Sequence, residues 1–184
     1  MSPLRHILDA AVETGAALRR DLAIVQDRCR RAGSTAPWIS ACADPSAAAL
    51  GLLRLSIGLR RATGRSFGSR TLLRWAFHID VWTDDIGPGL TLPHPFNIVI
   101  GSGVSIGADC TLLHNTTVQR GRRGRVGNGV VIATGCVVLE DRCIGDGAVC
   151  GANSVVTRDI PPGAVVVGAP ARIIRTQGAH AHAA

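Results

Sequence analysis

Two hydrophobic periodicities divide the chain into two parts. In the first part, apolar residues recur every three to four positions, which is the spacing of the buried face of an amphipathic α-helix. We expect the first helix to begin at Pro3, behind the capping residue Ser2, and to end before Gly33. Its predicted buried stripe consists of Leu4, Ile7, Leu8, Ala11, Leu18, Leu22, Val25 and Cys29.

Two further helices are predicted before residue 78. Asp44-Pro45 repeats the start signal, and the second helix should end near Gly64. Its predicted apolar stripe consists of Ala48, Leu52, Leu55 and Leu59. A third, shorter helix is expected over residues 70–77. The sequence therefore predicts an α-helical N-terminal region over residues 1–78, with its arginines on solvated faces.

From Ile86 onward the period changes to six residues. Bulky aliphatic or small apolar residues stand at Ile86, Leu92, Ile100, Ile106, Leu112, Val118, Val126, Ile132, Val138, Ile144, Cys150 and Val156. Glycine follows several of them, at Gly87, Gly101, Gly107, Gly127, Gly145 and Gly151. A hexapeptide period is typical of a parallel β-helix, in which three repeats close one triangular coil and the aliphatic side chain points inward. We expect the glycines to serve turns that need a positive φ or exclude a side chain.

The six-residue register is interrupted at two places. Two extra residues enter between Leu92 and Ile100, just after His94, and residues 119–125 form the loop Gln-Arg-Gly-Arg-Arg-Gly-Arg. Insertions in solenoid proteins lie on one face, and that face usually binds the ligand. These two interruptions are therefore the first candidates for a functional site.

The amino-acid composition limits the kinds of molecule that the protein is expected to bind. All 20 basic residues are Arg, and the formal net charge of +7 suits an anionic small molecule. Nucleic-acid binding is not expected, because aromatic residues make up only 3% of the chain. We expect no membrane span, since no segment approaches about 18 apolar residues, and no secretory signal at the N-terminus, which favours the cytoplasm. The six cysteines form no C-x-x-C pair and are interpreted as packing residues.

Several segments resemble the hexapeptide-repeat acyltransferases, in the serine acetyltransferase-like branch that also contains colanic-acid-type polysaccharide acetyltransferases. The matching segments are residues 86–94, 98–101, 151–156, 161–164 and 167–174. The resemblance implies a mainly β fold, a left-handed parallel β-helix over residues 79–175, and acetyl-CoA-dependent O-acetyl transfer to a hydroxyl acceptor. It also implies a homotrimer or a dimer of trimers, with active sites between subunits.

The resemblance implies that His94 is the general base. This role suits its chemistry, because a hydroxyl attacks a thioester only when its proton is removed, and an unperturbed imidazole has a pKa of about 6.5. In the family a carboxylate upstream orients this histidine. Asp80 is the candidate here, although the spacing is one residue short, so Asp84 or Asp85 could take its place.

The loop and the last repeats are the candidate cofactor site. A backbone N–H of Gly121 or Gly124 could stabilise the oxyanion of the reaction. Guanidinium groups bind phosphate in a bidentate fork, so the loop arginines suit the phosphates of coenzyme A; they are Arg120, Arg122, Arg123 and Arg125. The resemblance places the pantetheine arm and adenine along Ala152, Gly168, Ala169, Pro170 and Arg172.

The acceptor is less well defined. Serine acetyltransferases carry Asp before the catalytic His, where this chain has Pro93, and an Arg-His pair in the following loop, which this chain lacks. Unmodified L-serine is therefore in doubt. His114 and Asn115 resemble the polysaccharide branch, which favours a sugar or other hydroxyl acceptor, and either residue could contact it.

Two other protein classes remain as alternatives. A γ-class carbonic anhydrase-like zinc site could use His78, His94 and His114, but the sequence lacks that family's closely spaced final pair of histidines, and we expect no metal. A β-helix that lost its activity could serve as an assembly or regulatory protein. The tail, residues 176–184, is expected to be disordered, with His180 and His182 solvated.

Overall fold

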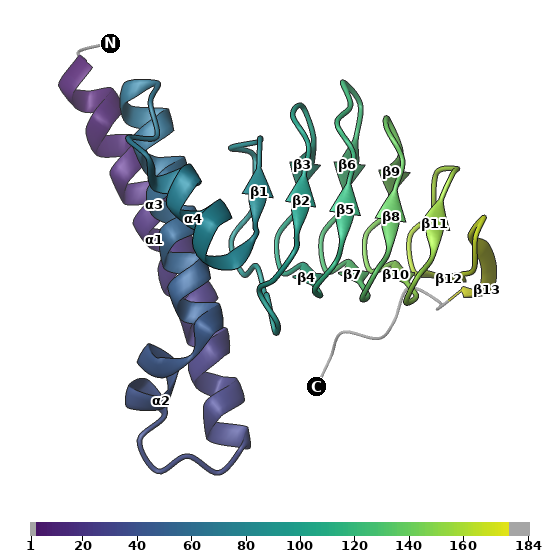
Figure 1. Ribbon diagram of the computed structural model, residues 1–184, viewed down its shortest axis with the longest axis horizontal. Helices are drawn as coiled ribbons and strands as arrows, with labels where there is room; N and C mark the ends of the chain where they lie inside the picture. The colour runs from purple at the N-terminus through teal and green to yellow at the C-terminus, as the bar shows by residue number, and fades with distance from the viewer. Residues whose placement is uncertain (1–2, 177–184) are drawn as a thin grey trace.

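The computed structural model describes residues 3–176. Four helices come first and thirteen short strands follow. The helices are α1 (Pro3–Arg31), α2 (Pro37–Ala43), α3 (Pro45–Thr63) and α4 (Ser69–Phe77). Helices α1 and α3 pack along each other beside the first turn of the strand region, and α4 lies against strand β1 (Figure 1). Helix α2 was not predicted from the sequence. Residues 177–184 of the expected disordered tail, including His180 and His182, lie outside the described residues.

The strands form the predicted left-handed parallel β-helix, which has about five turns (Figure 1). They are β1 (Asp80–Val81), β2 (Val99–Ile100), β3 (Ser105–Ile106), β4 (Thr111–Leu112), β5 (Thr117–Val118), β6 (Arg125–Val126), β7 (Val131–Ile132), β8 (Val137–Val138), β9 (Cys143–Ile144), β10 (Val149–Cys150), β11 (Val155–Val156), β12 (Ala164–Val167) and β13 (Arg172–Thr176). Thr176, which we expected to begin the disordered tail, is instead the last residue of β13.

Three sheets form the sides of the triangular coil. The first sheet has the order β1-β2-β5-β8-β11, the second β13-β12-β10-β7-β4, and the third β3-β6-β9. All neighbouring strands are parallel except β12 and β13, which pair antiparallel and end the coil. In each turn the chain runs from the first sheet through the third and the second, and then returns to the first.

The hexapeptide register is confirmed by burial. All twelve residues of the predicted aliphatic grid are at most 5% exposed and lie in one continuous core. The thiols of Cys110, Cys136 and Cys150 belong to the same core, and we call them the buried thiols. The packing interpretation of these three cysteines is therefore correct, and all six cysteines are free.

The glycines after the aliphatic positions serve close packing and not a positive φ. A Cβ at Gly87 would lie 2.6 Å from the carbonyl carbon of Gly107 in the next turn. A Cβ at Gly101 would lie 2.2 Å from the amide nitrogen of Arg120. The left-handed backbone conformation falls two residues later, for example at Gly89 and Gly103, with φ of 80° and 73°. Only the second half of our turn hypothesis, the exclusion of a side chain, therefore applies to these positions.

The predicted apolar stripe of α3 is only partly correct. Leu52 packs against the core. Leu55 is 53% exposed, whereas Leu50 and Leu53 are buried. The reason is that this helix also buries a charged residue, Arg54, which is only 2% exposed. The stripe predicted for α1 is likewise only partly correct, because Val25 is buried but Leu8 is 57% exposed.

Arg54 forms a buried ion pair that joins the helices to the coil. Its Nε lies 2.7 Å from Oδ2 of Asp21, a residue of α1 that is fully buried. Arg54 also donates to the carbonyl oxygens of Ile86 and Gly87, at 2.8 and 2.6 Å. In turn, Oδ1 of Asp21 accepts hydrogen bonds from the amides of Gly89 and Leu90. The pair therefore fixes the segment 86–90, which leads directly to His94.

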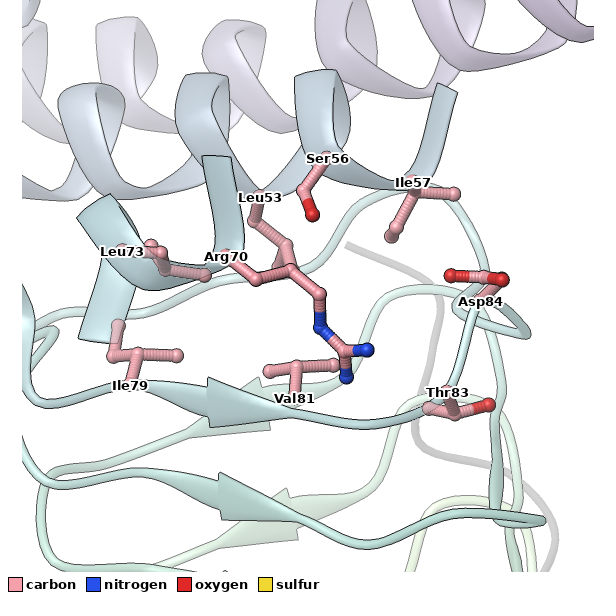
Figure 2. A pocket seen from close by; sticks show the side chains of 9 residues that line it. All are labelled: Leu53, Ser56, Ile57, Arg70, Leu73, Ile79, Val81, Thr83 and Asp84. Carbon is pink, nitrogen blue, oxygen red and sulfur yellow. The ribbon is translucent and has the colours of Figure 1, made fainter. Parts of the chain in front are cut away.

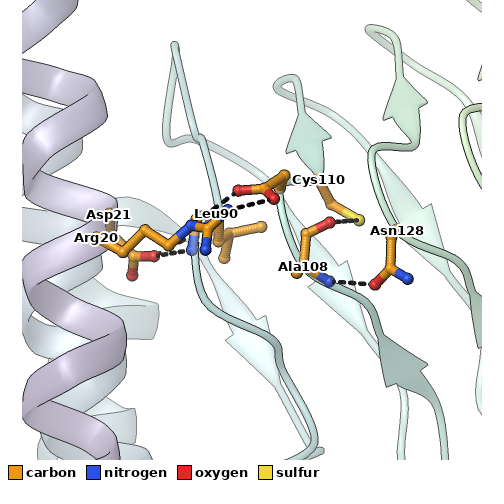
Figure 3. A network of polar contacts seen from close by, with 8 residues as sticks. Arg20, Asp21, Leu90, Ala108, Cys110 and Asn128 are labelled. Carbon is orange, nitrogen blue, oxygen red and sulfur yellow. Dashed lines mark hydrogen bonds and ion pairs between the residues drawn. The ribbon is translucent and has the colours of Figure 1, made fainter. Parts of the chain in front are cut away.

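A second contact between α1 and the coil lies at the surface. Arg20 pairs with Asp109 in the following turn, with Nη2 and Oδ2 2.6 Å apart (Figure 3). Both side chains are about half exposed, so this pair contributes little to stability. Within residues 3–176, no helix is long and apolar enough to cross a membrane.

Candidate functional site

His94 lies at the corner where the chain passes from the second sheet to the first. Thr91 forms an isolated bridge with Thr111 in the second sheet, and β2 of the first sheet begins at Val99. The residues between them include the predicted insertion, and they turn sharply, with the amide of Phe96 donating to the carbonyl of His94 at 2.8 Å. His94 is exposed, which leaves its imidazole accessible to a ligand.

The imidazole of His94 has a second histidine beside it. The ring centroids of His94 and His114 are 5.7 Å apart and the rings meet edge to face, at 76°. Nδ1 of His114 is buried and has no hydrogen-bond partner among residues 3–176. Sequence analysis proposed both residues, and the structure brings them together.

The residues that follow the two histidines in the chain are neutral. Nδ2 of Asn97 donates to Oδ1 of Asn115 at 3.0 Å, and both asparagines adopt a positive φ at the corner. The ring of Phe96 is 45% exposed and packs on Phe77 with a centroid distance of 6.2 Å. Phe96 and Asn97 were missed from the sequence, although both lie within the insertion after His94 that marked this face.

The same corner continues along the whole coil. Backbone hydrogen bonds connect successive turns there, from Asn115 to Phe96, from Gly135 to His114, from Asn153 to Thr134 and from Val155 to Gly168. We call this corner the His94 edge: His94, His114, Asn115, Ala152 and residues 168–170. Neighbouring turns are about 4.8 Å apart, so four steps place Gly168 about 19 Å from His94 along the coil axis.

The His94 edge thus joins the predicted base to one group of predicted cofactor residues. Ala152 is exposed on the turn before β11, and Gly168, Ala169 and Pro170 are exposed beside it. The amide of Ala171 donates to the carbonyl of Val155 at 2.8 Å, which fixes this segment against the first sheet. Arg172 begins β13 at the end of the segment and is also exposed.

The upstream carboxylates make no hydrogen bond to His94 within residues 3–176. Asp80 lies in β1, opposite Val99, and is half-buried. Asp84 instead pairs with Arg60, with Nη2 and Oδ2 3.2 Å apart. The backbone carbonyl of Asp85 accepts from the amide of Ile106, while its side chain is in no hydrogen bond or ion pair of the described chain. Of the three carboxylates, that of Asp80 belongs to β1, which pairs with β2, the strand that follows His94.

The arginine loop lies at a different corner, between the first and third sheets. Residues 119–124 connect β5 to β6, and the loop is fixed to its neighbouring turns. The amide of Gly121 donates to the carbonyl of Ser102 at 3.0 Å, so that N–H is already used. The carbonyl oxygen of Gly124 accepts a hydrogen bond from the amide of Ser105. Of the two glycines, only Gly124 therefore keeps an amide without such a bond among the described residues.

The loop arginines do not form one group. Arg120, Arg122 and Arg123 are exposed on the loop, whereas Arg125 is part of β6 and lies between Ser105 and Cys143 on the outer face of the third sheet. The amide of Arg123 donates to Oδ1 of Asp141 at 2.9 Å. That hydrogen bond, helped by the nearby guanidinium groups, holds the pKa of Asp141 below its ordinary value.

The predicted site residues therefore fall into two sets at opposite corners of the first sheet. His94, His114, Asn115 and the C-terminal cofactor residues share the His94 edge, while the arginine loop lies across the sheet. Within residues 3–176, no three or more His, Cys, Asp or Glu side chains gather as a metal site would need, so His78 does not join the other two histidines in a zinc-binding group.

Comparison with known proteins relates the chain to serine acetyltransferases. It is 41% identical over 95 residues to the serine acetyltransferase of Helicobacter pylori strain J99, which covers 48% of this chain and 56% of that protein. It is 42% identical over 95 residues to the mitochondrial serine acetyltransferase 3 of Arabidopsis thaliana, covering 48% of this chain and 24% of that protein. The chain thus spans about half or less of the length of these curated relatives. No protein-family model matches it.

Solved structures give the same relationship. The serine acetyltransferase of Brucella abortus aligns with a TM-score of 0.80 and 25% identity, over 97% of this chain and 75% of that one. Soybean serine acetyltransferase complexed with serine aligns with a TM-score of 0.73 and 27% identity, over 88% of this chain and 70% of that one. A serine acetyltransferase in complex with CoA shares the fold, with a TM-score of 0.74 and 23% identity over 94% and 74% of the two chains. The resemblance drawn from the sequence motifs is confirmed.

Proposed function

The chain is related in sequence and fold to the serine acetyltransferases among the hexapeptide-repeat acyltransferases, and from this relationship we propose that it transfers an acetyl group from acetyl-CoA to a hydroxyl acceptor. The observation that carries the proposal is the His94 edge. It presents one exposed imidazole and, about 19 Å along the coil, the small-residue segment 168–170.

His94 acts as the general base in this proposal. Its imidazole removes the proton from the acceptor hydroxyl while the oxygen attacks the thioester carbonyl. Gly121 and Gly124 lie across the first sheet from His94, so either amide would reach the oxyanion only from a neighbouring copy, and that of Gly121 is already bonded to Ser102. Asp80 remains the candidate for orienting His94, since Asp84 pairs with Arg60.

Acetyl-CoA would extend along the His94 edge. The flexible pantetheine arm needs a surface without large side chains, and Ala152, Gly168 and Ala169 offer one. Arg172 begins β13 directly after residues 168–170 of this edge, so we choose it for a contact with a CoA phosphate within one chain. Arg120, Arg122 and Arg123 stand across the first sheet and would reach this cofactor only from a neighbouring copy. This division favours an oligomer with sites between subunits, and the family resemblance makes a homotrimer, or a dimer of trimers, our choice.

The test is release of free thiol from acetyl-CoA, measured with the purified full-length chain and a panel of acceptors. The panel contains L-serine, related hydroxy amino acids, free sugars and nucleotide sugars. Acceptor-dependent thiol release at catalytic rates would support acetyl transfer. Binding of CoA without release for any acceptor of the panel would favour the alternative of a β-helix that serves assembly or regulation.

A sugar acceptor is the second candidate, and the neighbours of His94 favour it. A zwitterionic amino acid needs charged partners, but the ring beside His94 is that of His114, and Phe96, Asn97 and Asn115, which follow the two histidines in the chain, are neutral. Amides and imidazoles hydrogen-bond to neutral hydroxyls, and an exposed aromatic ring packs on the apolar face of a sugar. His114→Gln should then raise KM for the sugar more than it lowers kcat, whereas thiol release with serine alone would reject this candidate.

A further inference from the structure

A groove lies away from the His94 edge. It measures about 580 Å³, and its walls include Trp82, Val99, Ser102, Gln119, Arg120 and Glu140. An adjoining groove of about 500 Å³ shares Ser102, Arg120 and Glu140 and adds Arg122 and Asp141. We call the two together the trough. Its lining comes from four successive turns of the coil, after β1, β2, β5 and β8, at the corner of the arginine loop.

One end of the trough is formed by Trp82, and an arginine packs on one face of its ring. The guanidinium carbon of Arg70 lies 4.5 Å from the centre of the Trp82 ring, a cation–π contact. Arg70 is itself held: it reaches from α4 between α3 and β1, past Val81 and toward Thr83 (Figure 2). Trp82 nevertheless remains 51% exposed. Because Arg70 occupies one face of the indole ring, the opposite face is available for a planar ligand.

The other end of the trough is lined by Arg120 and Arg122 and by the acidic residues Glu140 and Asp141. The loop 119–125 and the turn 139–142 carry three further arginines outside this lining, so the corner as a whole is basic. Arg120 and Arg122 form no ion pair with a carboxylate of the described chain. The loop backbone is anchored on both sides, at Ser102 and at Asp141. The guanidinium groups of Arg120 and Arg122 therefore extend from a fixed backbone and are available to bind an anion.

The spacing of the two ends suits one ligand class. Trp82 and Gln119 follow β1 and β5, which are two strands apart in the first sheet. Two strand spacings correspond to about 10 Å. A ligand that spans this distance needs a flat aromatic group at one end and a phosphate at the other. Ser102, which comes after β2 and so lies between the two ends, could hydrogen-bond to hydroxyl groups of such a ligand, whereas Glu140 lies one strand beyond the loop arginines.

We propose that the trough binds a nucleotide, with its base stacked on Trp82 and its phosphates held by Arg120 and Arg122. Base–aromatic stacking depends little on which base is present, because every base has a π-face. Two sources share this chemistry: the nucleotide part of CoA held from a neighbouring copy, and a separate nucleotide such as the carrier of an activated sugar acceptor. The trough lies across the first sheet from the His94 edge of the same chain.

Calorimetric titration of the purified full-length chain with ADP, UDP and CoA tests this site. Trp82→Leu and Arg120→Gln should each weaken nucleotide binding by about tenfold or more, the range expected for one lost stacking or phosphate contact. Trp82→Phe, which keeps an aromatic face, should retain most of the affinity. Trp38→Leu and Arg74→Gln are matched controls, because both side chains are exposed on helices that do not line the trough.

The outcomes separate the two sources and the proposed function. If UDP binds to a chain saturated with CoA, the trough holds a second nucleotide; if CoA and UDP compete and Trp82→Leu weakens both, it holds the nucleotide of CoA. No binding of any of the three ligands, or binding that Trp82→Leu leaves unchanged, would overturn the proposal. The titration involves no acyl transfer, so its failure is distinct from a failure of the proposed function.

Discussion

The buried ion pair between Arg54 and Asp21 gives the most demanding test of the fold. Arg54→Met removes the guanidinium but keeps most of the length of the side chain. The variant loses two hydrogen bonds to the Asp21 carboxylate and two to the carbonyls of Ile86 and Gly87. Asp21 stays fully buried and keeps only the amides of Gly89 and Leu90.

Removing one partner of a buried ion pair typically costs about 3–5 kcal/mol, because the remaining charge is uncompensated. A chain of this size loses about 2–4 °C in Tm per kcal/mol. Arg54→Met should therefore lower Tm by about 6–20 °C, measured by circular dichroism at one fixed protein concentration. Arg31→Met is the control, since Arg31 pairs with Asp27 while its side chain is 81% exposed, and it should cost at most about 1 kcal/mol.

The double variant separates the ion pair from simple loss of packing. Asn at position 21 can still accept from Gly89 and Leu90 but brings no buried charge. Asp21→Asn combined with Arg54→Met should therefore be more stable than Arg54→Met alone, with a coupling energy of about 1–3 kcal/mol. Equal stability of Arg54→Met and Arg31→Met, or a double variant that shows simple additivity, would refute the reasoning.

Three smaller predictions concern packing, capping and thiol access. Gly87→Ala should cost about 1–3 kcal/mol in urea unfolding because its Cβ meets the next turn at 2.6 Å, whereas Gly51→Ala in α3 has nothing within 4 Å and should gain about 0.5–1 kcal/mol. Burial alone would raise the pKa of Asp44, but hydrogen bonds from the α3 amide it caps and from a nearby arginine lower it. Asp44→Ala should thus cost about 1 kcal/mol at pH 7, a difference that is lost as the pH falls from the ordinary pKa of this carboxyl, 3.8, through its lowered pKa in the folded chain, below which it is protonated in both states. In a thiol-reagent assay the exposed Cys42 should react in the native chain, and the buried thiols only after unfolding.

The coil could be predicted from sequence because its rule is local. Each aliphatic position, such as Ile100 or Ile132, points inward for the same geometric reason, so the six-residue period is visible without tertiary information. The faces of α1 and α3 could not be predicted in this way. A periodicity of apolar residues assigns charged side chains to solvent, and it therefore missed the buried pair of Asp21 and Arg54.

The site was partly predictable for a similar reason. The insertion after His94 marked the candidate corner, and His114 follows in the next turn of the same corner. The separation of the arginine loop from His94 depends on which corner of the triangle each segment occupies, which motif matching does not give. The contact of Arg70 with Trp82 joins a helix to the coil, and no local pattern in the sequence connects the two.

The central claim is that His94 removes the acceptor proton during acetyl transfer. Its most direct test is the rate of thiol release from acetyl-CoA by His94→Ala, compared with the wild type and with His78→Asn, a change at another exposed histidine. Our account predicts a loss of about 10²–10⁴ in kcat for His94→Ala, with CoA affinity and oligomeric state unchanged and His78→Asn close to wild type. An unchanged rate for His94→Ala would contradict it.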